Sequence, residues 1–309
     1  MSTQKPIVVV GSINTDLVAI ADRIPSVGET VIGTGFQVHP GGKGANQAVA
    51  AARLGYPVQM IGRLGNDSFG AQLRTHMRSV GVDCSGIAAC EEPSGVAVIL
   101  VSSRGENCIV VAPGANALVS PEDLEANLAL IRNAGLVLAQ LEIPLETVEY
   151  LSVLCRRASV PLILDPAPAR ELPPAIFRNV TWFTPNETEA AFYAGSETAP
   201  PAEIAGTLLA RGCHGVLLKM GARGAYLAAA GHPGEWVPAF PVNAIDTTAA
   251  GDAFNGGFAT GLMMGRPPFE SAIFAAAVAA ISVTRAGAQP SMPALPDVEE
   301  FLEKQCVRD

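Results

Sequence analysis

Short apolar segments of strand-like composition alternate with helix-like segments along most of this chain, and this alternation limits the possible folds more than any other feature. The helical segments include residues 46–54 and 69–80 and one that begins after Ser120 with Pro121 in its first turn. Strands that alternate with helices are typical of a doubly wound, largely parallel sheet. The candidate core strands are residues 7–10, 58–61, 135–139, 162–165, 180–184 and 216–219. The sequence therefore predicts an α/β fold with a mainly parallel sheet flanked by helices.

Two regions, about 13–38 and 95–112, break this alternation because they are extended and rich in β-branched residues but contain no helix pattern. The second region is expected to fold as a hairpin around S-S-R-G-E-N. We expect both regions to form a small antiparallel sheet inserted into a single domain, residues 1–309. Ligands of open α/β sheets bind at the carboxyl ends of the strands, so this sheet is well placed to act as a lid.

The composition is that of a compact globular protein, with 49% hydrophobic and 16% charged residues. The net charge of −9 argues against a nucleic acid or an anionic membrane as partner. The N-terminus has no signal-peptide pattern, and the apolar run 274–281 is too short to cross a membrane. Six cysteines without CxxC and four histidines without HExxH suggest free thiols and no zinc site. We therefore expect a cytoplasmic protein.

The loop H-P-G-G-K-G-A-N (39–46) is rich in glycine and leads into a predicted helix. It lacks the first glycine of a Walker A loop, and Gln47 occupies the last glycine position of a Rossmann fingerprint. Two interpretations remain. The loop is either a turn that opens a helix with Lys43 in solvent, or a backbone cradle whose Gly42 and Asn46 face a polar ligand.

The segment T-P-N-E-T-E directly follows a predicted strand. Asn186 and Glu189 have the spacing of a helix capping box, and the same two side chains also suit magnesium-bound water and phosphate. Their spacing alone does not separate the two interpretations. Glu142, at the end of another strand, is either a helix-start charge or a ligand for sugar hydroxyls. Asn14 and Asp16 follow the first strand, so these polar groups begin to describe one pocket.

The stretch N-A-I-D-T-T-A-A-G-D-A-F-N-G-G-F places two carboxylates among residues too small to build a core. Ala249, Ala250 and Gly251 precede an apolar helix predicted over 253–264, so their N–H groups would point at one spot unobstructed. That arrangement is an anion hole. Asp252 beside it is either an N-cap or a general base next to a transferring phosphoryl group.

Six motifs in this order resemble those of the PfkB-type carbohydrate kinase family, in particular its ribokinase branch. They are G-S-I-N-T-D, G-G-K-G-A-N-Q-A-V-A-A, Q-L-E-I-P, T-P-N-E-T-E, G-A-R-G and D-T-T-A-A-G-D. The likeness extends from Val8 to Pro293. Many family members have G-A-G-D where this chain has A-A-G-D, and the ribokinase branch accepts the alanine.

The resemblance implies a role for each matching residue, with Asp252 as the base that takes the proton from the sugar O5 hydroxyl. Anion-hole residues would be Ala249, Ala250 and Gly251. Sugar ligands would be Asn14, Asp16, Gly42, Lys43, Asn46 and Glu142. Nucleotide ligands would be Asn186, Lys219, Gly221, Gly224 and Gly251. Glu189 would act on magnesium through water. A potassium site would comprise Asp246, Thr248, Ser282, Gly287 and Ser291.

The function that this resemblance implies is ATP-dependent phosphorylation of D-ribose to ribose 5-phosphate, with Mg²⁺ accompanying ATP and K⁺ as activator. The alternatives are a kinase for 2-deoxyribose, fructose or a nucleoside, and a sugar-binding protein without catalysis. Retention of Asp252 beside an anion hole speaks against a pure binder. Residues 96–101 are apolar at every position, so both faces of this hairpin need cover. We expect the second face to pack on the same sheet of another subunit in a homodimer.

Overall fold

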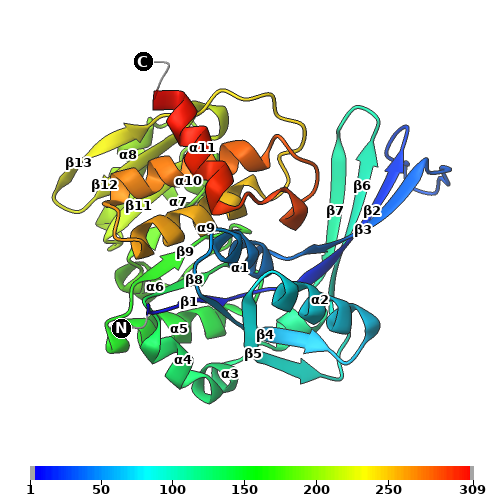
Figure 1. Cartoon of the computed structure of the whole chain (residues 1–309), viewed down its shortest axis with the longest axis horizontal. Helices are drawn as coiled ribbons and strands as arrows, with labels where there is room; N and C mark the ends of the chain where they lie inside the picture. Colours follow the sequence, from blue (N-terminus) through cyan, green and yellow to red (C-terminus); the bar gives the residue numbers. More distant parts are fainter. Residues whose placement is uncertain (1–3, 307–309) are drawn as a thin grey trace.

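The computed structural model describes residues 4–306 and contains a large main sheet and a smaller second sheet (Figure 1). The main sheet has nine strands in the order β13-β12-β11-β10-β9-β8-β1-β4-β5. Pairing is parallel from β11 to β5, and β12 and β13 are antiparallel additions at one edge. The strands are β1 (Ile7–Val10), β4 (Val58–Gly65), β5 (Val82–Cys90), β8 (Leu136–Ala139), β9 (Leu162–Leu164), β10 (Trp182–Phe183), β11 (Gly215–Lys219), β12 (Ala225–Ala229) and β13 (His232–Val237). The predicted α/β fold is confirmed.

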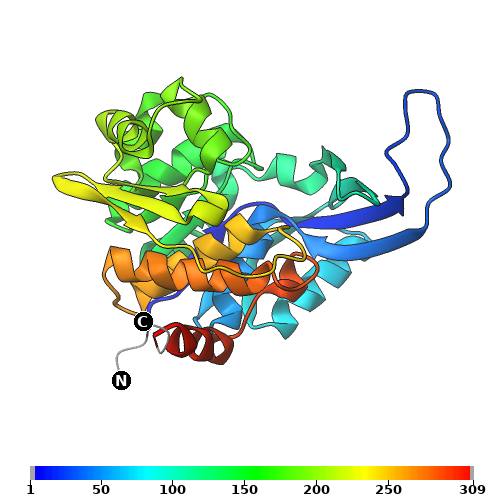
Figure 2. The same ribbon diagram turned by 90° about the horizontal axis from the view of Figure 1, so that it is seen from above.

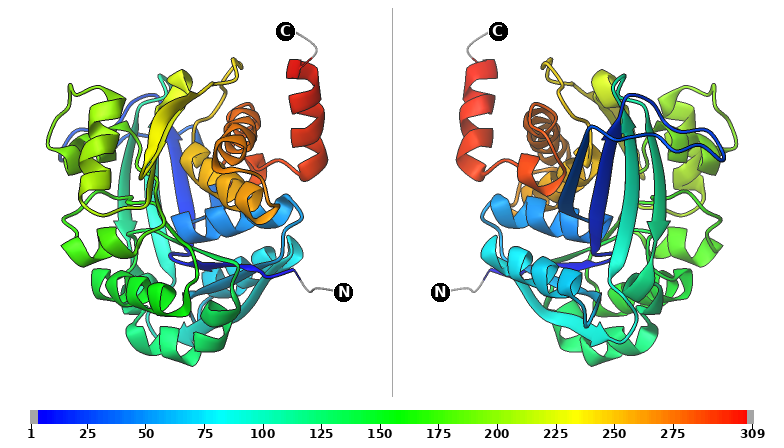
Figure 3. Two further views of the ribbon diagram at one scale, coloured as in Figure 1. Left: turned by 90° about the vertical axis from the view of Figure 1, so that its left-hand side faces the viewer. Right: turned by 90° about the vertical axis from the view of Figure 1, so that its right-hand side faces the viewer.

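Helices cover both faces of the main sheet, as Figure 3 shows. Side chains of a strand alternate between its faces, so Ile7 and Val9 of β1 enter one core cluster and Val8 and Val10 enter the other. The first cluster packs against α1 (Lys43–Arg53), α2 (Ser68–Ser79), α9 (Ala250–Met263), α10 (Pro268–Ser282) and α11 (Leu295–Cys306). The second packs against α3 (Pro121–Ala126), α4 (Leu128–Asn133), α5 (Leu145–Ala158), α6 (Pro174–Asn179), α7 (Glu187–Ala194) and α8 (Pro201–Ala210). Short 3-10 turns are η1 (Gly114–Leu118), η2 (Gly221–Arg223) and η3 (Gln289–Ser291).

The second sheet projects from one side of the main body (Figure 1) and consists of two hairpins. One hairpin is β2 (Asn14–Ala21) with β3 (Gly35–Gly41), and the other is β6 (Gly95–Ser102) with β7 (Asn107–Ala112). Each hairpin is antiparallel, as predicted, but the two join through β2 and β6, which are parallel. A long loop links β2 to β3 and reaches away from the molecule (Figure 2).

Several predicted element boundaries need correction. The helix predicted over 46–54 already begins at Lys43, and the strand predicted over 180–184 shrinks to Trp182–Phe183. The helix predicted over 253–264 begins three residues earlier, at Ala250, because Ala249 takes a left-handed conformation (φ 58°) that turns the chain into the helix. Asp252 therefore lies in the first turn of α9 and is not its N-cap, which is Ala249.

Among residues 4–306, no helix is long and apolar enough to cross a membrane.

Candidate active site

The glycine-rich segment from the end of β3 to the first turn of α1 packs directly onto the end of β1 and the start of β2. A Cβ at Gly42 would lie 2.7 Å from the backbone nitrogen of Asn14, and one at Gly44 would lie 2.7 Å from the carbonyl carbon of Gly11. A Cβ at Gly41 would overlap the Asp16 carboxylate. Gly42 also has a φ of 88°, which favours glycine. The glycines thus bring the loop against the residues that carry Asn14 and Asp16.

Asp252 is buried in the first turn of α9 and is held by two amides of α1. Asn46 Nδ2 donates to its Oδ2 at 2.9 Å, and Gln47 Nε2 donates to its Oδ1 at 3.0 Å. Burial raises the pKa of Asp252, while Lys43 and these two hydrogen bonds oppose that rise. A buried carboxylate with a raised pKa, fixed by oriented donors, suits proton abstraction.

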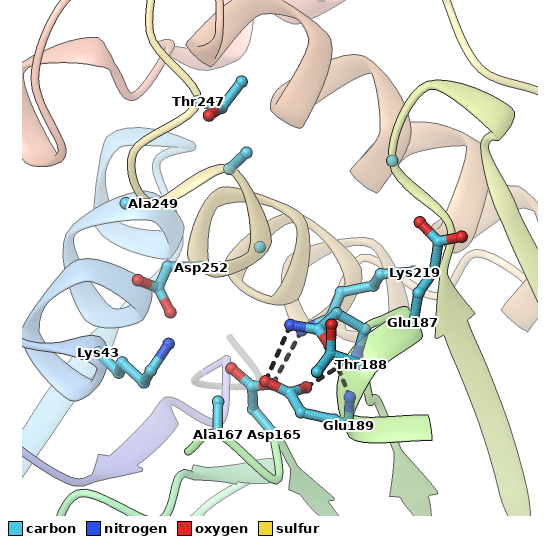
Figure 4. A pocket seen from close by; sticks show the side chains of 14 residues that line it. Lys43, Asp165, Ala167, Glu187, Thr188, Glu189, Lys219, Thr247, Ala249 and Asp252 are labelled. Carbon is cyan, nitrogen blue, oxygen red and sulfur yellow. Dashed lines mark hydrogen bonds and ion pairs between the residues drawn. The ribbon is translucent and has the colours of Figure 1, made fainter. Parts of the chain in front are cut away.

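A chain of polar contacts connects Asp252 with the far side of the cavity. Its last link, between Lys219 and Asp165, is drawn in Figure 4. Gln47 Nε2 also donates to Asp165 Oδ2 at 2.9 Å, and Lys219 Nζ donates to Asp165 Oδ1 at 2.8 Å. Gln140 Nε2 donates to Gln47 Oε1 at 2.7 Å. The ends of β8, β9 and β11 thus meet the helices α1 and α9 through side chains. Gln47, Asp165 and Gln140 were not predicted from the sequence.

Lys43 points into the cavity, facing Asp252 and Asp165 in Figure 4, and is only partly exposed. Burial by itself lowers the pKa of Lys43, but the surrounding carboxylates, Asp252 foremost, outweigh it and the net pKa is raised. The ammonium group therefore stays charged at any physiological pH. The structure favours the cradle interpretation of this loop over the one that leaves Lys43 in solvent.

Asn14 and its neighbour Asn116 form a buried amide pair. Asn116 Nδ2 donates to Asn14 Oδ1 at 2.7 Å, and Asn116 Oδ1 accepts from the backbone of Ile13 at 2.9 Å. The pair fixes the orientation of the Asn14 side chain and leaves its NH₂ group free to donate. Asn116 was missed by the sequence analysis, because its A-N-A context carries no spacing signal.

Asp16 and Glu142 bring two further carboxylates to the same edge of the sheet. Burial raises the pKa of Asp16 to about 7, with the charges of Glu142 and Asp252 adding to the rise. Glu142 accepts a hydrogen bond from Ser12 Oγ at 2.5 Å and one from Lys43 N at 3.2 Å. The predicted sugar ligands therefore lie within electrostatic reach of one another and of Asp252.

Asn186 and Glu189 form the capping box at the start of α7. Asn186 Oδ1 accepts from Glu189 N at 2.9 Å, and Glu189 Oε2 accepts from Asn186 N at 2.8 Å. Both side chains also line a cavity of about 440 Å³ together with Lys43, Asp165 and Lys219. Burial and the charge of Asp165 raise the pKa of Glu189. The capping role and a role at the cavity are therefore compatible.

A second cavity of about 530 Å³ adjoins the first and has a mostly apolar lining. Gly221 borders both cavities, and Gly224 borders the second. Gly224 has a φ of 93°, and a Cβ there would overlap the carbonyl oxygen of Val237. A larger residue would thus disturb the G-A-R-G turn as well as the cavity wall.

The start of α9 presents backbone N–H groups toward the 440 Å³ cavity. Ala250 N donates to Thr247 O at 3.2 Å. Within the part of the chain that the structure describes, no group accepts from the N–H of Gly251 or Asp252. Ala249, Ala250, Gly251 and Asp252 all line this cavity. Free N–H groups at a helix N-terminus form an anion-binding site.

The residues predicted to bind potassium lie in two segments, the loop before α9 and the stretch from the last residue of α10 to η3. Asp246 Oδ1 accepts from Thr248 N at 2.9 Å, and its Oδ2 accepts from Gly287 N at 2.8 Å. Ser282 precedes Val283, whose carbonyl accepts from the backbone of 245–246. Ser291 is buried, and its hydroxyl donates to Ala288 O at 2.7 Å. Asp246 thus ties the loop before α9 to the loop after α10.

The comparisons with known proteins agree with this geometry. The family model described as pfkB family carbohydrate kinase matches residues 4–295. Ribokinase of Haemophilus influenzae is 40% identical over 304 residues, covering 97% of this chain and 99% of that protein. The chain belongs to the pfkB family of carbohydrate kinases.

Two further similar proteins are kinases of five-carbon sugars. A structure of Arabidopsis thaliana ribokinase complexed with ribose and ATP superposes with a TM-score of 0.90 and 34% identity, covering 97% of this chain and 99% of that chain. Deoxyribokinase of Salmonella typhi is 35% identical over 302 residues, covering 96% of this chain and 98% of that protein. The fold and the sequence are thus similar to those of pentose kinases over almost the whole chain.

Proposed function

We propose that this protein phosphorylates D-ribose at O5 with ATP, giving ribose 5-phosphate and ADP. The observation that carries the proposal is the position of Asp252. This buried carboxylate interacts electrostatically with Asp16, as Glu142 does, and it also lines the cavity that the free N–H groups of α9 border. A base placed between a hydroxyl-binding region and an anion site suits transfer of a phosphoryl group to an alcohol.

The sugar lies, in this proposal, against the carboxyl end of β1 and the second sheet. The carboxylates of Asp16 and Glu142 accept hydrogen bonds from its hydroxyls, and the free NH₂ group of Asn14 donates one. Gly42 leaves room for the ring, and Asn46 holds Asp252 toward the O5 hydroxyl. The second sheet acts as a lid that excludes water, which would otherwise accept the phosphoryl group.

Phosphoryl transfer requires positioning and charge stabilisation more than covalent chemistry. Asp252 takes the proton of the O5 hydroxyl as this oxygen attacks the γ-phosphorus, and ADP leaves in line. The N–H groups of Gly251 and Asp252 and the ammonium groups of Lys43 and Lys219 stabilise the negative charge on the transferred group. No covalent enzyme intermediate is needed.

Two cations complete the proposal. Mg²⁺ arrives with ATP. Burial and the nearby charge of Asp165 raise the pKa of Glu189, and a divalent cation would relieve this repulsion between two carboxylates. Glu189 would bind it through water. Potassium would bind between the two loops that Asp246 joins, using this carboxylate, the Thr248 carbonyl and groups near Ser282, Gly287 and Ser291. Oxygen donors of this kind suit a hard monovalent cation.

We also propose a homodimer formed through the second sheet. Val38, Val98 and Val110 occupy neighbouring register positions with Leu17 on the face opposite Asp16, and all three are exposed. Such an apolar patch marks an interface. The same face of a second copy is its proposed cover, with a two-fold axis between them.

A second candidate substrate is 2-deoxyribose, favoured by the 35% identity to a deoxyribokinase. Fructose and non-catalytic sugar binding remain further alternatives. The test is an ADP-release assay over ribose, 2-deoxyribose, fructose and a nucleoside, with and without potassium. We expect the highest kcat/KM with ribose. A higher value with another sugar would replace ribose in the proposal, and binding without ADP release would leave a sugar-binding protein.

A further inference from the structure

Among the described residues, the 530 Å³ cavity has no polar side chain in its lining beyond the residues that it shares with the 440 Å³ cavity. The two cavities share Lys219, Gly221, Thr247, Ala250 and Gly251, so these residues mark their junction. Beyond the junction, every described residue that lines the 530 Å³ cavity has an apolar side chain or is a glycine. Phe240, Val242, Phe254, Ala276, Ala279 and Val283 are among them.

Two elements supply most of this apolar lining. Helix α10 contributes Ala276, Ala279 and Ala280, and its C-cap Val283 continues the same helical stripe. None of these side chains can form a hydrogen bond. The opposite wall, residues 238–244, has no regular secondary structure. Any hydrogen bond from this wall to a nucleobase therefore comes from a peptide group and not from a side chain.

We propose that this protein accepts GTP and ITP as well as ATP, because the pocket selects the nucleobase of the donor by shape rather than by side-chain hydrogen bonds. This inference rests on the proposed kinase function and extends it to the donor. An apolar pocket separates ligands of similar shape by only about 10- to 200-fold, whereas a pocket built to hydrogen-bond a group rejects its analogue by about 10⁴ or more.

The test is kcat/KM for ATP, GTP and ITP with ribose saturating and magnesium in excess. We expect the value for GTP to lie within about a hundredfold of that for ATP. A larger preference for ATP would overturn the inference. Titration calorimetry of the Mg²⁺ complexes of ATP and GTP without sugar measures donor binding independently. An absence of ribose-dependent turnover with every donor, with similar binding of both nucleotides, would contradict the proposed function alone.

The variant Ala279→Asn sharpens the test because it places one carboxamide on the part-exposed wall of this cavity. We expect it to change the ATP-to-GTP ratio of kcat/KM at least about tenfold while the KM for ribose stays constant. Ala71→Asn, on the exposed surface of α2, is the matched control and should leave the ratio unchanged. A ratio unaffected by Ala279→Asn would show that side chains on this wall do not face the base, and the inference would fail.

An independent observation concerns Gln47, whose side chain is fully buried between two aspartates. Its Nε2 donates to Asp165 and Asp252 at 2.9 and 3.0 Å, so both N–H bonds of the amide are used. Gln140 donates to Gln47 Oε1 and thereby fixes which end of the amide faces the acids. Each aspartate must accept at the bonded oxygen, which favours its ionised form.

Charges from every side act on this arrangement. Lys43 of α1 and Asp165 beyond β9 both influence Asp252, and Asp16 of β2 interacts with it electrostatically. Lys219 is paired with Asp165 at 2.8 Å and compensates its charge. The bridging amide occupies the position between two like charges that would otherwise compete for a proton.

We infer that Gln47 is a positioning residue that keeps Asp252 ionised and aimed by supplying a neutral donor between the two acids. Replacing Gln47 with Met keeps the side-chain volume but removes the donor. The lost hydrogen bond favours protonated Asp252, so the acid limb of the kcat–pH profile should move to higher pH. We expect kcat to fall about tenfold more at pH 6 than at pH 8.

Gln59→Met is the matched control, because Gln59 Nε2 donates to Asp83 Oδ2 at 3.1 Å in an exposed pair that lines neither cavity. It should leave the profile unchanged. An equal loss of kcat at all pH values in Gln47→Met would indicate a merely structural role and overturn the inference. If that variant does not fold, Gln140→Met frees the amide to rotate and should shift the acid limb in the same direction. An unmoved limb there would also overturn it.

Discussion

Two regions of the molecule differ in how complete they are within one chain. One is the region between helices α1 and α9, and the other is the second sheet. Between the helices, Asn46, Gln47 and Asp252 are buried and joined by hydrogen bonds at 2.9–3.0 Å. On the outer face of the second sheet, Val98 and Val110 remain 44% and 65% exposed. The chemical groups are thus assembled by one chain, whereas the sheet that would cover the sugar has an apolar face that one chain leaves open.

Replacing the general base Asp252, in the region between α1 and α9, has the largest expected effect. Asp252→Asn keeps the shape of the side chain but cannot accept the O5 proton. We expect kcat to fall by about 10² to 10⁴, the usual contribution of general-base catalysis, while ribose still binds. Steady-state kinetics with titration calorimetry of ribose measure both. A near-normal kcat would reduce Asp252 to a structural residue of the first helical turn.

Placing a charge on the second sheet tests the other region. Val98→Lys would bury two ammonium groups in each two-fold dimer, so we expect its dissociation constant to rise at least about a hundredfold. Light scattering in dilute solution should report a dimer for the unmodified chain and a monomer for the variant. The unfolding midpoint of the main sheet should change little.

The matched control for this variant lies on the opposite face of the same sheet. Val111 is 45% exposed, close to the value for Val98, but it shares the face of Ala97 and Asp16. Val111→Lys should therefore leave the dimer intact. A monomeric unmodified chain at micromolar concentration, or a dimer lost equally in both variants, would contradict the proposed interface.

The pKa of Asp16, raised to about 7, gives the sugar region a pH dependence. The carboxyl group is mostly protonated below that pH and loses acceptor capacity, so ribose affinity should increase about tenfold from pH 6 to pH 8. Asp16→Asn should bind more weakly and without this dependence. Calorimetry at several pH values measures it, and a flat profile for the unmodified chain would argue against Asp16 as a ligand.

The raised pKa of Asp16 also makes the free energy of unfolding depend on pH, and this dependence runs opposite to that of ribose affinity. Because the folded-state pKa of Asp16 exceeds the ordinary value of 3.8, this group stabilises the sugar-free protein at low pH. That contribution is lost as the pH rises from about 4 through about 7.

The smallest expected effect concerns potassium. If the ion binds between the loops joined by Asp246, it stiffens the entrance to α9 without touching the sugar. We expect potassium to raise kcat about fivefold and lithium to do little. Asp246→Ala should remove the potassium response. Equal activity in potassium-free and potassium-rich buffer would exclude this ion as an activator.

Local patterns predicted the fold well where one segment decides the outcome. Continuous apolar runs gave β1 and β11 because strands buried on both faces need no alternation. Strands β5, β12 and β13 were not predicted. Strands β5 and β13 are the two edges of the sheet and β12 is next to β13. Shorter apolar runs and polar positions such as Asp83 and Glu235 dilute the pattern there.

The site was predicted only in part, for a similar physical reason. Asp252 and Glu142 stand in motifs that one segment supplies. Gln47 and Gln140 are 93 residues apart in the chain. Their side chains contact each other only because the fold brings α1 to the end of β8. Asp165 did carry a usable signal, since it directly follows the buried strand β9 as Glu142 follows the region of β8. Side chains that meet only in the folded structure have no characteristic spacing in the sequence from which their contact could be predicted.

Identification of the reaction product tests the proposed phosphorylation of ribose at O5 most directly. The purified protein is incubated with ribose and magnesium ATP, and phosphorus NMR with proton coupling shows which oxygen carries the phosphate. We expect ribose 5-phosphate and ADP in equal amounts, and at most about one hundredth of that initial product from Asp252→Asn over the same interval. Phosphate on another sugar oxygen, ADP without sugar phosphate, or equal product from the variant would contradict the proposal.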